Sequence, residues 1–353
     1  MPQVTTYLTQ AVQDGASDLF LVAGGKVSEK LEGQITPITQ EKLTPADADL
    51  LISQIYDLAN RDMAPFRATG DDDFSFAIPG LARFRVSSYR QRGSLAAVIR
   101  VVSFDIPDWQ SLRIPPQVME LSAAPHGLIL FTGSAGSGKS TTQACLIDRI
   151  NRTRPCHIIT LEDPIEFLHR NQLSIVSQRE IAVDTHDYLS ALRSCLRQAP
   201  DVILLGEMRD PETIRTAMTA AETGHLVIAT LHTRGAANTI DRIIDAFPST
   251  QQSQIRVQLS MALHTVVSQQ LIPGTDGELV PAYEIMHSNN AIRNLIREGK
   301  TYQLDNAIAA GSAEGMQSMD HALFSLVQRG LISAEDALTH ADHPEQLQRR
   351  LRK

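Results

Sequence analysis

Residues 127–140 read Gly-Leu-Ile-Leu-Phe-Thr-Gly-Ser-Ala-Gly-Ser-Gly-Lys-Ser, and this stretch decides the fold of the second part of the chain. Its apolar first half predicts a buried strand, and the glycine-rich half leads into a helix that begins near Lys139. Gly133, Gly136 and Gly138 let the backbone turn so that several N–H groups face one anion. A strand, a glycine-rich loop and a helix in this order are typical of a site for the phosphates of a nucleotide.

The sequence also places a cation and a hydroxyl where a triphosphate needs them. Lys139 can reach the β- and γ-phosphates, and the Ser140 hydroxyl can ligate Mg²⁺. An ordinary glycine turn would fit too, but this loop pattern arises by chance in roughly one chain in a hundred of this length. We therefore expect the chain to bind ATP and Mg²⁺. The candidate nucleotide-binding residues are Gly133, Ser134, Ala135, Gly136, Ser137, Gly138, Lys139, Ser140 and Thr141.

Length and composition limit the remaining possibilities. A chain of 353 residues favours two domains. The formal net charge is −8 with no basic run, which disfavours a nucleic-acid motor because such a protein needs a basic surface. Three scattered cysteines do not make a disulfide framework, and no stretch approaches the roughly 18 apolar residues of a membrane span. We expect a cytoplasmic protein with no nucleic-acid partner and no direct membrane insertion.

The first part of the chain, residues 1–105, mixes helical and strand signals. Apolar residues recur at helical spacing in two segments and alternate with period two in others. Two alternating runs flank Pro79-Gly80, as in a β-hairpin. The last three predicted strands are expected to form a small antiparallel sheet. The patterns predict helices over 4–12 and 50–58 and strands over 18–22, 73–78, 82–89 and 95–102.

The second part reads as an α/β domain. The segment 106–124 is rich in proline and is interpreted as an interdomain linker. Beyond it, short apolar runs alternate with helical segments, which predicts a mostly parallel sheet covered on both faces. The ATPase core is expected over 125–285 and a helical region over 286–353. The strands of the core are predicted at 127–132, 157–161, 202–205 and 226–231.

An acidic segment, Thr160-Leu-Glu-Asp-Pro-Ile-Glu166, follows the second of these strands. Open α/β sheets bind their ligands at the carboxyl ends of strands. Glu162 and Asp163 suit coordination of Mg²⁺ through water, and Glu166 is a candidate to polarise an attacking water. The alternative is an acidic turn around Pro164 without a catalytic role. The phosphate loop earlier in the chain favours the functional interpretation.

The next strand, in Asp201-Val-Ile-Leu-Leu-Gly-Glu-Met-Arg-Asp210, resembles a Walker B strand. The match is atypical, because Gly206 stands where an aspartate usually holds the metal, and the glycine permits the strand to approach the nucleotide closely. Glu207 is then the candidate to orient or activate the hydrolytic water. Arg209 and Asp210 are expected to pair with each other on the surface.

A third segment, Gly224-His-Leu-Val-Ile-Ala-Thr-Leu-His-Thr233, places a histidine at each end of a buried strand. His232 lies at the end where the phosphate loop is expected, so it is a candidate to sense the γ-phosphate as a hydrogen-bond donor. Histidines near strands are usually structural residues. For His225 the structural and the functional interpretation both stay open.

Together these segments resemble the PilT-type ATPases of the type II/IV secretion superfamily, the motors that retract type IV pili. The resemblance covers nearly the whole chain. Its most specific motif is Ala291-Ile-Arg-Asn-Leu-Ile-Arg-Glu298, the C-terminal signature of retraction motors. The other motifs, besides the phosphate loop, are Gly15-Ala-Ser-Asp-Leu19, Ala82-Arg-Phe-Arg-Val86, Glu162-Asp-Pro-Ile-Glu166, Gly206-Glu-Met-Arg-Asp210, Thr223-Gly-His225 and Leu231-His-Thr233.

The resemblance implies a PAS-like N-terminal domain over 1–105, followed by a RecA-like ATPase domain with a helical C-terminal region. It implies a homohexamer that hydrolyses ATP to retract pili and drive twitching motility. The expected partners are an inner-membrane pilus platform protein and, indirectly, pilin, so that the protein works at the cytoplasmic face of the membrane. It also implies that Arg85, Arg92 and Arg100 of the first domain stabilise charge on the phosphates.

Four alternatives remain to be weighed. An extension or export ATPase usually carries a tetracysteine metal-binding insert, which a chain with three cysteines lacks. An accessory retraction ATPase or a secretion-system ATPase of the same superfamily is harder to exclude. A nucleotide-binding regulatory scaffold without turnover is disfavoured by the intact Lys139, Glu207 and His232. A nucleic-acid motor is disfavoured by the net charge.

Overall fold

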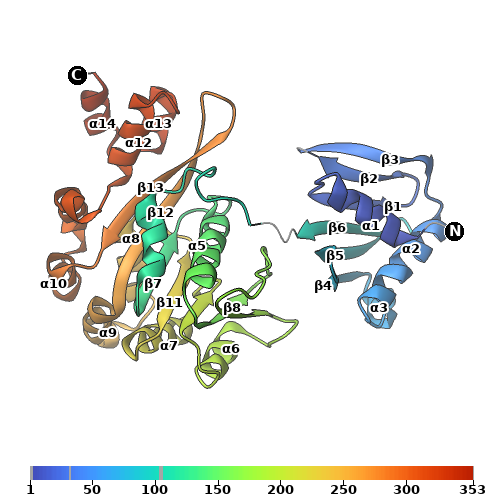
Figure 1. The fold of residues 1–353 in the computed structure, drawn as a ribbon, viewed down its shortest axis with the longest axis horizontal. Helices are drawn as coiled ribbons and strands as arrows, with labels where there is room; N and C mark the ends of the chain where they lie inside the picture. The colour runs from blue at the N-terminus through green and yellow to red at the C-terminus, as the bar shows by residue number, and fades with distance from the viewer. Residues whose placement is uncertain (1–2, 32, 103–105, 353) are drawn as a thin grey trace. The chain divides into compact units, whose positions relative to one another are not determined.

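The computed structural model describes residues 3–31, 33–102 and 106–352. The chain divides into two compact units, coloured blue to teal and teal to red in Figure 1. The first contains residues 1–105 together with 166–168, and the second contains 106–165 together with 169–353. The predicted domain boundary at residue 105 falls on 103–105, which lie outside the described residues.

The first unit is an antiparallel sheet with the strand order β3-β2-β1-β6-β5-β4. Helices α1 and α2 pack on its central strands β1 and β6. The predicted helices and the hairpin are confirmed, and the hairpin turns at Pro79-Gly80 between β4 and β5. The elements of this unit are α1 Val4–Gln13, β1 Asp18–Val22, β2 Lys26–Leu31, β3 Gln34–Lys42, α2 Pro45–Leu58, α3 Ala64–Thr69, β4 Asp71–Ile78, β5 Ala82–Gln91 and β6 Ser94–Val102.

Strands β2 and β3 were not predicted. Strand β3 reads Gln-Ile-Thr-Pro-Ile-Thr-Gln-Glu-Lys and has no buried residue, so the alternation that marks a half-buried strand is missing. It lies at the sheet edge, where Pro37 is tolerated because an edge strand needs fewer backbone donors.

The second unit is a seven-stranded sheet with the order β13-β12-β7-β11-β10-β8-β9. All neighbours are parallel except β12 and β13, so the predicted parallel strands β7, β8, β10 and β11 are confirmed. The strands are β7 Gly127–Thr132, β8 His157–Glu162, β9 Ile175–Glu180, β10 Val202–Leu205, β11 Leu226–Leu231, β12 Leu263–Pro273 and β13 Leu279–His287.

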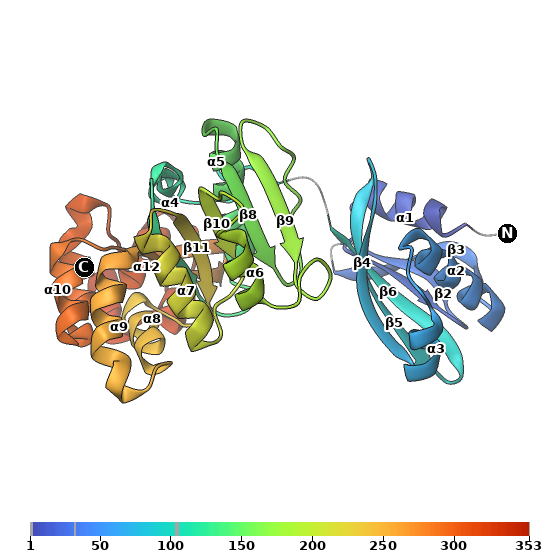
Figure 2. The ribbon, with the colours of Figure 1, turned by 90° about the horizontal axis from the view of Figure 1, so that it is seen from below.

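Helices cover both faces of this sheet, as Figure 2 shows, with α4 and α5 on one side and α6, α7, α8 and α9 on the other. Of the helices that follow β13, α12, α13 and α14 pack on β12 and β13 in a separate apolar cluster, whereas α10 and α11 join the cluster that contains α8 and α9. No described helix has the length and apolarity required to cross a membrane. The helices are α4 Pro116–Glu120, α5 Lys139–Thr153, α6 Tyr188–Cys195, α7 Pro211–Glu222, α8 Ala236–Asp245, α9 Ser249–Ala262, α10 Asn290–Glu298, α11 Leu304–Ala310, α12 Met319–Gln328, α13 Ala334–His340 and α14 Pro344–Leu351.

The proline-rich segment 106–124 belongs to the second unit rather than standing free between the two. It contains α4, and its apolar side chains enter the core beneath α5. Val118 and Met119 are fully buried there, and Ile114 and Leu121 are nearly so. Proline density marked the irregular backbone correctly, but a segment that buries this much apolar surface is part of the fold.

Candidate active site

Four parallel strands lie next to one another in the order β7, β11, β10 and β8, so that their carboxyl ends share one edge of the sheet. The register pairs Leu231, at the end of β11, with Thr132, at the end of β7. Four of the motifs singled out in the sequence leave the sheet at this edge. They are the phosphate loop after β7, His232 after β11, Glu207 after β10, and Glu162 at the end of β8.

The phosphate loop between β7 and α5 requires glycine at three positions. Gly133, Gly136 and Gly138 have φ angles of 141°, 76° and 84°, which other residues rarely adopt. Space is also limited at Gly133, where a Cβ atom would lie 2.3 Å from the carbonyl oxygen of Gln269. The backbone therefore has the curled form that the sequence predicts.

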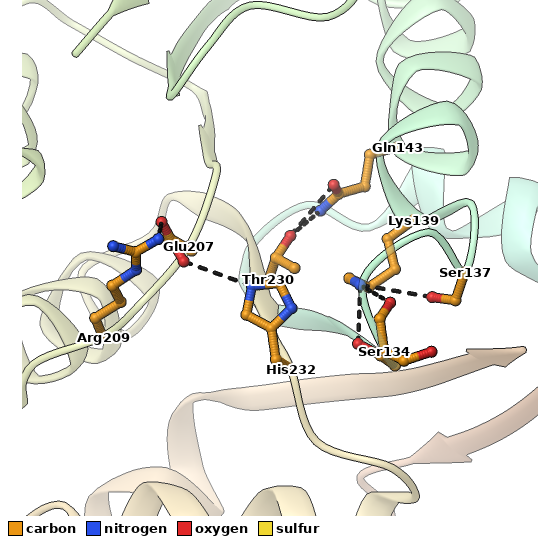
Figure 3. A network of polar contacts seen from close by, with 9 residues as sticks. Ser134, Ser137, Lys139, Gln143, Glu207, Arg209, Thr230 and His232 are labelled. Atoms are coloured by element: carbon orange, nitrogen blue, oxygen red, sulfur yellow. Dashed lines mark hydrogen bonds and ion pairs between the residues drawn. The ribbon is translucent and has the colours of Figure 1, made fainter. Parts of the chain in front are cut away.

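Lys139 is the first residue of α5 and is only 7% exposed. Its Nζ donates to the carbonyl oxygens of Gly133 at 2.8 Å and Ser134 at 2.7 Å, and lies 3.5 Å from Ser137 Oγ (Figure 3). A buried ammonium needs such partners. Together with the N-terminus of α5, it places positive charge inside the loop, which suits a phosphate group.

Ser140 is exposed in the first turn of α5, so its hydroxyl is accessible to an ion at the loop. Glu162 accepts hydrogen bonds from Thr160 Oγ1 at 2.5 Å and Gln178 Nε2 at 3.2 Å, and Asp163 is exposed. Within the part of the chain that the structure describes, no three acidic, histidine or cysteine side chains form a metal site of their own. Mg²⁺ that arrives with a nucleotide needs only one or two protein ligands, because phosphates and waters supply the rest.

Glu207 lies at the centre of a polar cluster at the end of β10. Its side chain is 10% exposed, and its Oε1 forms an ion pair of 2.5 Å with Arg209. Its Oε2 lies 3.5 Å from His232 Nε2, and Figure 3 shows both contacts. The expected pairing of Arg209 with Asp210 is wrong, because the Asp210 carboxylate caps α7 by accepting from the N–H and the hydroxyl of Thr213.

Tyr188, at the start of α6, is a further residue beside Glu207, and no sequence pattern predicted it. A Cβ atom at Gly206 would lie 2.7 Å from its hydroxyl and 3.1 Å from the carbonyl oxygen of Leu161. The glycine therefore makes room for the tyrosine and for β8. Burial raises the pKa of Tyr188, and the charges of Glu207 and Asp163 raise this pKa further, so the phenol stays protonated and can act only as a neutral group.

A buried hydrogen bond ties α5 to β11 close to His232. Gln143 Nε2 donates to Thr230 Oγ1 at 3.0 Å, and Thr230 Oγ1 is 3.3 Å from Gln143 Oε1. Thr230 precedes His232 by two residues, so this contact fixes the end of β11 relative to the phosphate-loop helix. His225 lies at the opposite end of β11, with Nδ1 2.9 Å from the carbonyl oxygen of Ala220, which supports its structural interpretation.

The remaining acidic candidate, Glu166, is exposed and belongs to the short segment 166–168 of the first unit. The second unit by itself therefore brings together Glu162, Glu207 and His232, and does not include Glu166.

The three candidate arginines also belong to the first unit. Arg85 on β5 and Arg100 on β6 pair directly in the antiparallel register, and both are exposed. Arg100 Nε donates to Asp18 Oδ1 at 3.0 Å. Arg92 lies in the turn between the two strands with a φ of 47°. The first unit thus places Arg85 and Arg100 side by side and Arg92 at the end of the hairpin.

A cavity of about 330 Å³ opens beside the first turn of α5. At its edge Thr142 Oγ1 donates to Gln269 Oε1 at 2.9 Å and lies 3.1 Å from the hydroxyl of Tyr283. Mixed aliphatic and polar walls next to a phosphate loop can hold a base and a ribose. The lining residues are Ser111, Leu112, Arg113, Ile114, Gly138, Thr141, Thr142, Gln269, Leu271, Glu278, Leu279, Pro281 and Tyr283.

Comparisons with known proteins agree with this geometry. The family model of type II/IV secretion system proteins matches residues 1–335. The type IV pilus retraction ATPase PilT of Pseudomonas aeruginosa is 45% identical over 343 residues, which are 97% of this chain and 99% of that protein. The type IV pilus ATPase PilU of the same organism is 38% identical, over 95% of this chain and 88% of that protein. A crystal structure of the pilus retraction motor PilT with bound ADP matches with a TM-score of 0.90 and 44% identity, over 99% of this chain and 100% of that one.

Proposed function

The chain belongs to the type II/IV secretion system protein family, and from this premise we propose that it is an ATP hydrolase that drives type IV pilus retraction and twitching motility. One observation carries the proposal. The similarity to a pilus retraction motor extends over nearly the full length of both chains. The geometry is consistent with it, because the four motifs of the ATPase unit meet at one sheet edge.

ATP is proposed to bind with its phosphates in the loop and its nucleoside in the adjoining cavity. Lys139 would exchange the carbonyl oxygens of Gly133 and Ser134 for oxygens of the β- and γ-phosphates. Mg²⁺ would neutralise phosphate charge, held by Ser140, with Glu162 and Asp163 binding its water ligands.

Glu207 is proposed to orient the hydrolytic water. It is nearly buried, and its two oxygens face Arg209 and His232. His232 is more exposed, so it can turn to the γ-phosphate when a nucleotide arrives, and this would free Oε2 for the water. Glu166 is the alternative base, and Arg85, Arg92 and Arg100 are proposed to stabilise charge in the transition state.

The proposed assembly is a homohexamer that works at the cytoplasmic face of the membrane. Its partners would be an inner-membrane pilus platform protein and, through it, pilin. The exposed Arg293, Asn294 and Arg297 of α10 leave a polar face for such a partner, while Ile292 and Ile296 anchor the helix.

A second candidate is an accessory retraction ATPase, supported by the 38% identity to PilU over most of both chains.

Two measurements distinguish the retraction motor from the accessory ATPase, a regulatory scaffold and an extension motor. Purified protein should release phosphate from ATP, and lack of turnover in the hexamer would favour a regulatory scaffold. Deletion of the gene should leave surface pili in excess and abolish twitching, whereas loss of pili would indicate an extension motor. Retained twitching after the deletion would favour the accessory role.

A further inference from the structure

The four residues that follow His232 are each fixed to another part of the second unit. Thr233 Oγ1 lies 2.7 Å from Thr239 Oγ1, and the Arg234 guanidinium donates to Gln270 Oε1 at 2.7 Å. The N–H of Gly235 donates to Ser268 Oγ at 3.0 Å, and the N–H of Ala236 donates to Glu284 Oε1 at 2.6 Å. We call these residues, 233–236, the segment after His232.

Glu284, on β13, differs from the other anchors because it is an acidic residue that is almost completely buried, with 3% exposure. Helix α8 begins at Ala236, and its N-cap residue Gly235 offers no side chain to accept from the free N–H groups of the first turn. Glu284 supplies that acceptor from a different element. A negative charge at this position also faces the positive end of α8.

The other side of Glu284 faces the C-terminal helices. It accepts a backbone hydrogen bond from Met319, the first residue of α12, and forms the wall of a cavity of about 190 Å³. The pKa of Glu284 is raised to about 7, chiefly by burial; the charges of Asp342 and Asp305 also raise this pKa, and the backbone N–H groups of Ala236 and Met319 lower it. The other charged groups around the cavity are Asp320, His343 and Arg350, and Arg234 lies near Asp342.

A second contact ties the same two regions together. Gln270 accepts from Arg234 and donates through Nε2 to the carbonyl oxygen of His340 at 3.3 Å, at the end of α13. The segment after His232 is therefore linked to α12 through Glu284 and to α13 through Gln270. A shift of α12 or α13 would therefore displace Arg234 or Ala236, which lie two and four residues after His232.

We propose that Glu284 is a positioning residue for ATP hydrolysis: by capping α8 it holds His232 beside Glu207 and couples this contact to the C-terminal helices. The proposal rests on the proposed hydrolytic function. It assigns Glu284 no contact with nucleotide. A position error of about 1 Å at a reacting group can cost about 100-fold in rate, whereas the phosphate loop that binds ATP has anchors of its own.

The experiment uses the full chain with Glu284→Gln and compares kcat, KM and the affinity for a fluorescent ATP analogue. The amide keeps the size but replaces one of the two accepting carboxylate oxygens with an NH₂ group, which can only donate. We expect kcat to fall by about tenfold or more while the affinity stays within about threefold. Asp305→Asn is the matched control, because Asp305 lines the same cavity and faces His343 at 3.9 Å. Its kcat should stay within about twofold.

A pH profile adds a readout that a purely structural role would not move. In the wild type, protonation of Glu284 below pH 7 weakens the cap, so kcat should fall there more steeply than in Glu284→Gln. Ser268→Ala, which removes the acceptor for Gly235, is the second variant if Glu284→Gln does not fold, and it should give the same loss of kcat at unchanged affinity.

Three results would overturn the inference. They are an unchanged kcat in a folded Glu284→Gln or Ser268→Ala protein, a loss of nucleotide affinity equal to the loss of kcat/KM, and an equal defect in Asp305→Asn. Each of these presupposes a wild type that hydrolyses ATP. A wild-type hexamer without turnover would instead contradict the proposed function.

Discussion

Glu207 and His232 meet across the ends of two neighbouring parallel strands, with 3.5 Å between Glu207 Oε2 and His232 Nε2. The carboxylate is nearly buried and the histidine is more than half exposed, so the histidine side chain has more freedom to move than the carboxylate. The buried partner is positioned by the sheet, and the exposed partner can leave it for a phosphate. This asymmetry supports the proposed role of His232 as a residue that responds to the γ-phosphate.

Glu207→Gln should separate hydrolysis from binding. The amide keeps the shape but cannot serve as a base or carry the charge, so turnover should fall by a factor of about 10²–10⁴ while ATP affinity is retained. Hydrolysis and binding are measured on the same preparation. Glu212→Gln, at an exposed carboxylate paired with Arg193, is the control. Loss of ATP binding would make Glu207 a metal or structural group, and no effect would move the role of base to Glu166.

Lys139→Ala should abolish nucleotide binding or turnover. It removes the buried ammonium from the loop, and a lost charge-assisted hydrogen bond should cost at least roughly 1.5 kcal/mol, about tenfold in affinity. Titration with a fluorescent nucleotide and phosphate release test this together. Lys300→Ala, at an exposed lysine paired with Glu298, is the control. Turnover within about threefold of the wild type would contradict the assignment of the phosphate loop.

Local sequence patterns were sufficient to predict those elements whose signals lie within the element itself. The strand, loop and helix around Lys139 follow one another in sequence, and each has its own signal in apolar runs and glycines. Strand β12 was missed because it buries Ser268, Gln269 and Gln270, and polar residues in a sequence predict an exposed segment.

The site contacts that were missed share a different cause. Tyr188, Gln143 and Glu284 lie 18, 87 and 48 residues away from their partners Gly206, Thr230 and Ala236, on elements that only the folded sheet brings together. No periodicity encodes such a pairing. The packing of segment 106–124 was not predicted for a related reason, because prolines indicate irregular backbone and do not show whether that backbone is packed.

The stability of the protein should depend on pH through Glu284. Its pKa is raised from 4.5 to about 7 in the folded state, so folding takes up a proton between these values. The resulting stability is present below about pH 4.5 and is lost as the pH rises through 7, by roughly 3 kcal/mol in all.

Chemical unfolding of wild type and Glu284→Gln at pH 5 and pH 8 measures this effect. The advantage of the wild type over the variant should shrink between the two pH values. Glu335→Gln, at an exposed carboxylate of α13, should show no such change. A difference between wild type and Glu284→Gln that is equal at both pH values would show that the carboxyl has an ordinary pKa in the folded protein.

The second unit should fold alone only when the proline-rich segment is included. A fragment of residues 106–353 keeps the buried Ile114, Val118, Met119 and Leu121, whereas 125–353 loses them and exposes the core beneath α5. Burial of such side chains contributes about 1.5–3 kcal/mol each, so the shorter fragment should unfold at a much lower temperature or be insoluble. Equal thermal stability of the two fragments would contradict the assignment of this segment to the second unit.

The last prediction concerns the arginines of the first unit. If Arg85 and Arg100 act on the nucleotide, Arg85→Ala and Arg100→Ala should each lower hydrolysis by about 10³-fold with little change in melting temperature. Arg100 is 63% exposed and its ion pair with Asp18 contributes little to stability, so its removal should not unfold the sheet. Arg67→Ala, at an exposed ion pair with Asp49, is the control.

Asp18→Asn distinguishes the two roles open to Arg100. If its function is only to neutralise the buried Asp18, then Asp18→Asn removes the need for it, and the double variant with Arg100→Ala should recover full hydrolysis. If Arg100 stabilises charge on the phosphates, Asp18→Asn alone should retain hydrolysis and the double variant should stay as inactive as Arg100→Ala. The fragment 106–353 should then bind nucleotide yet hydrolyse it poorly. Full activity of that fragment would show that the first unit supplies no catalytic group.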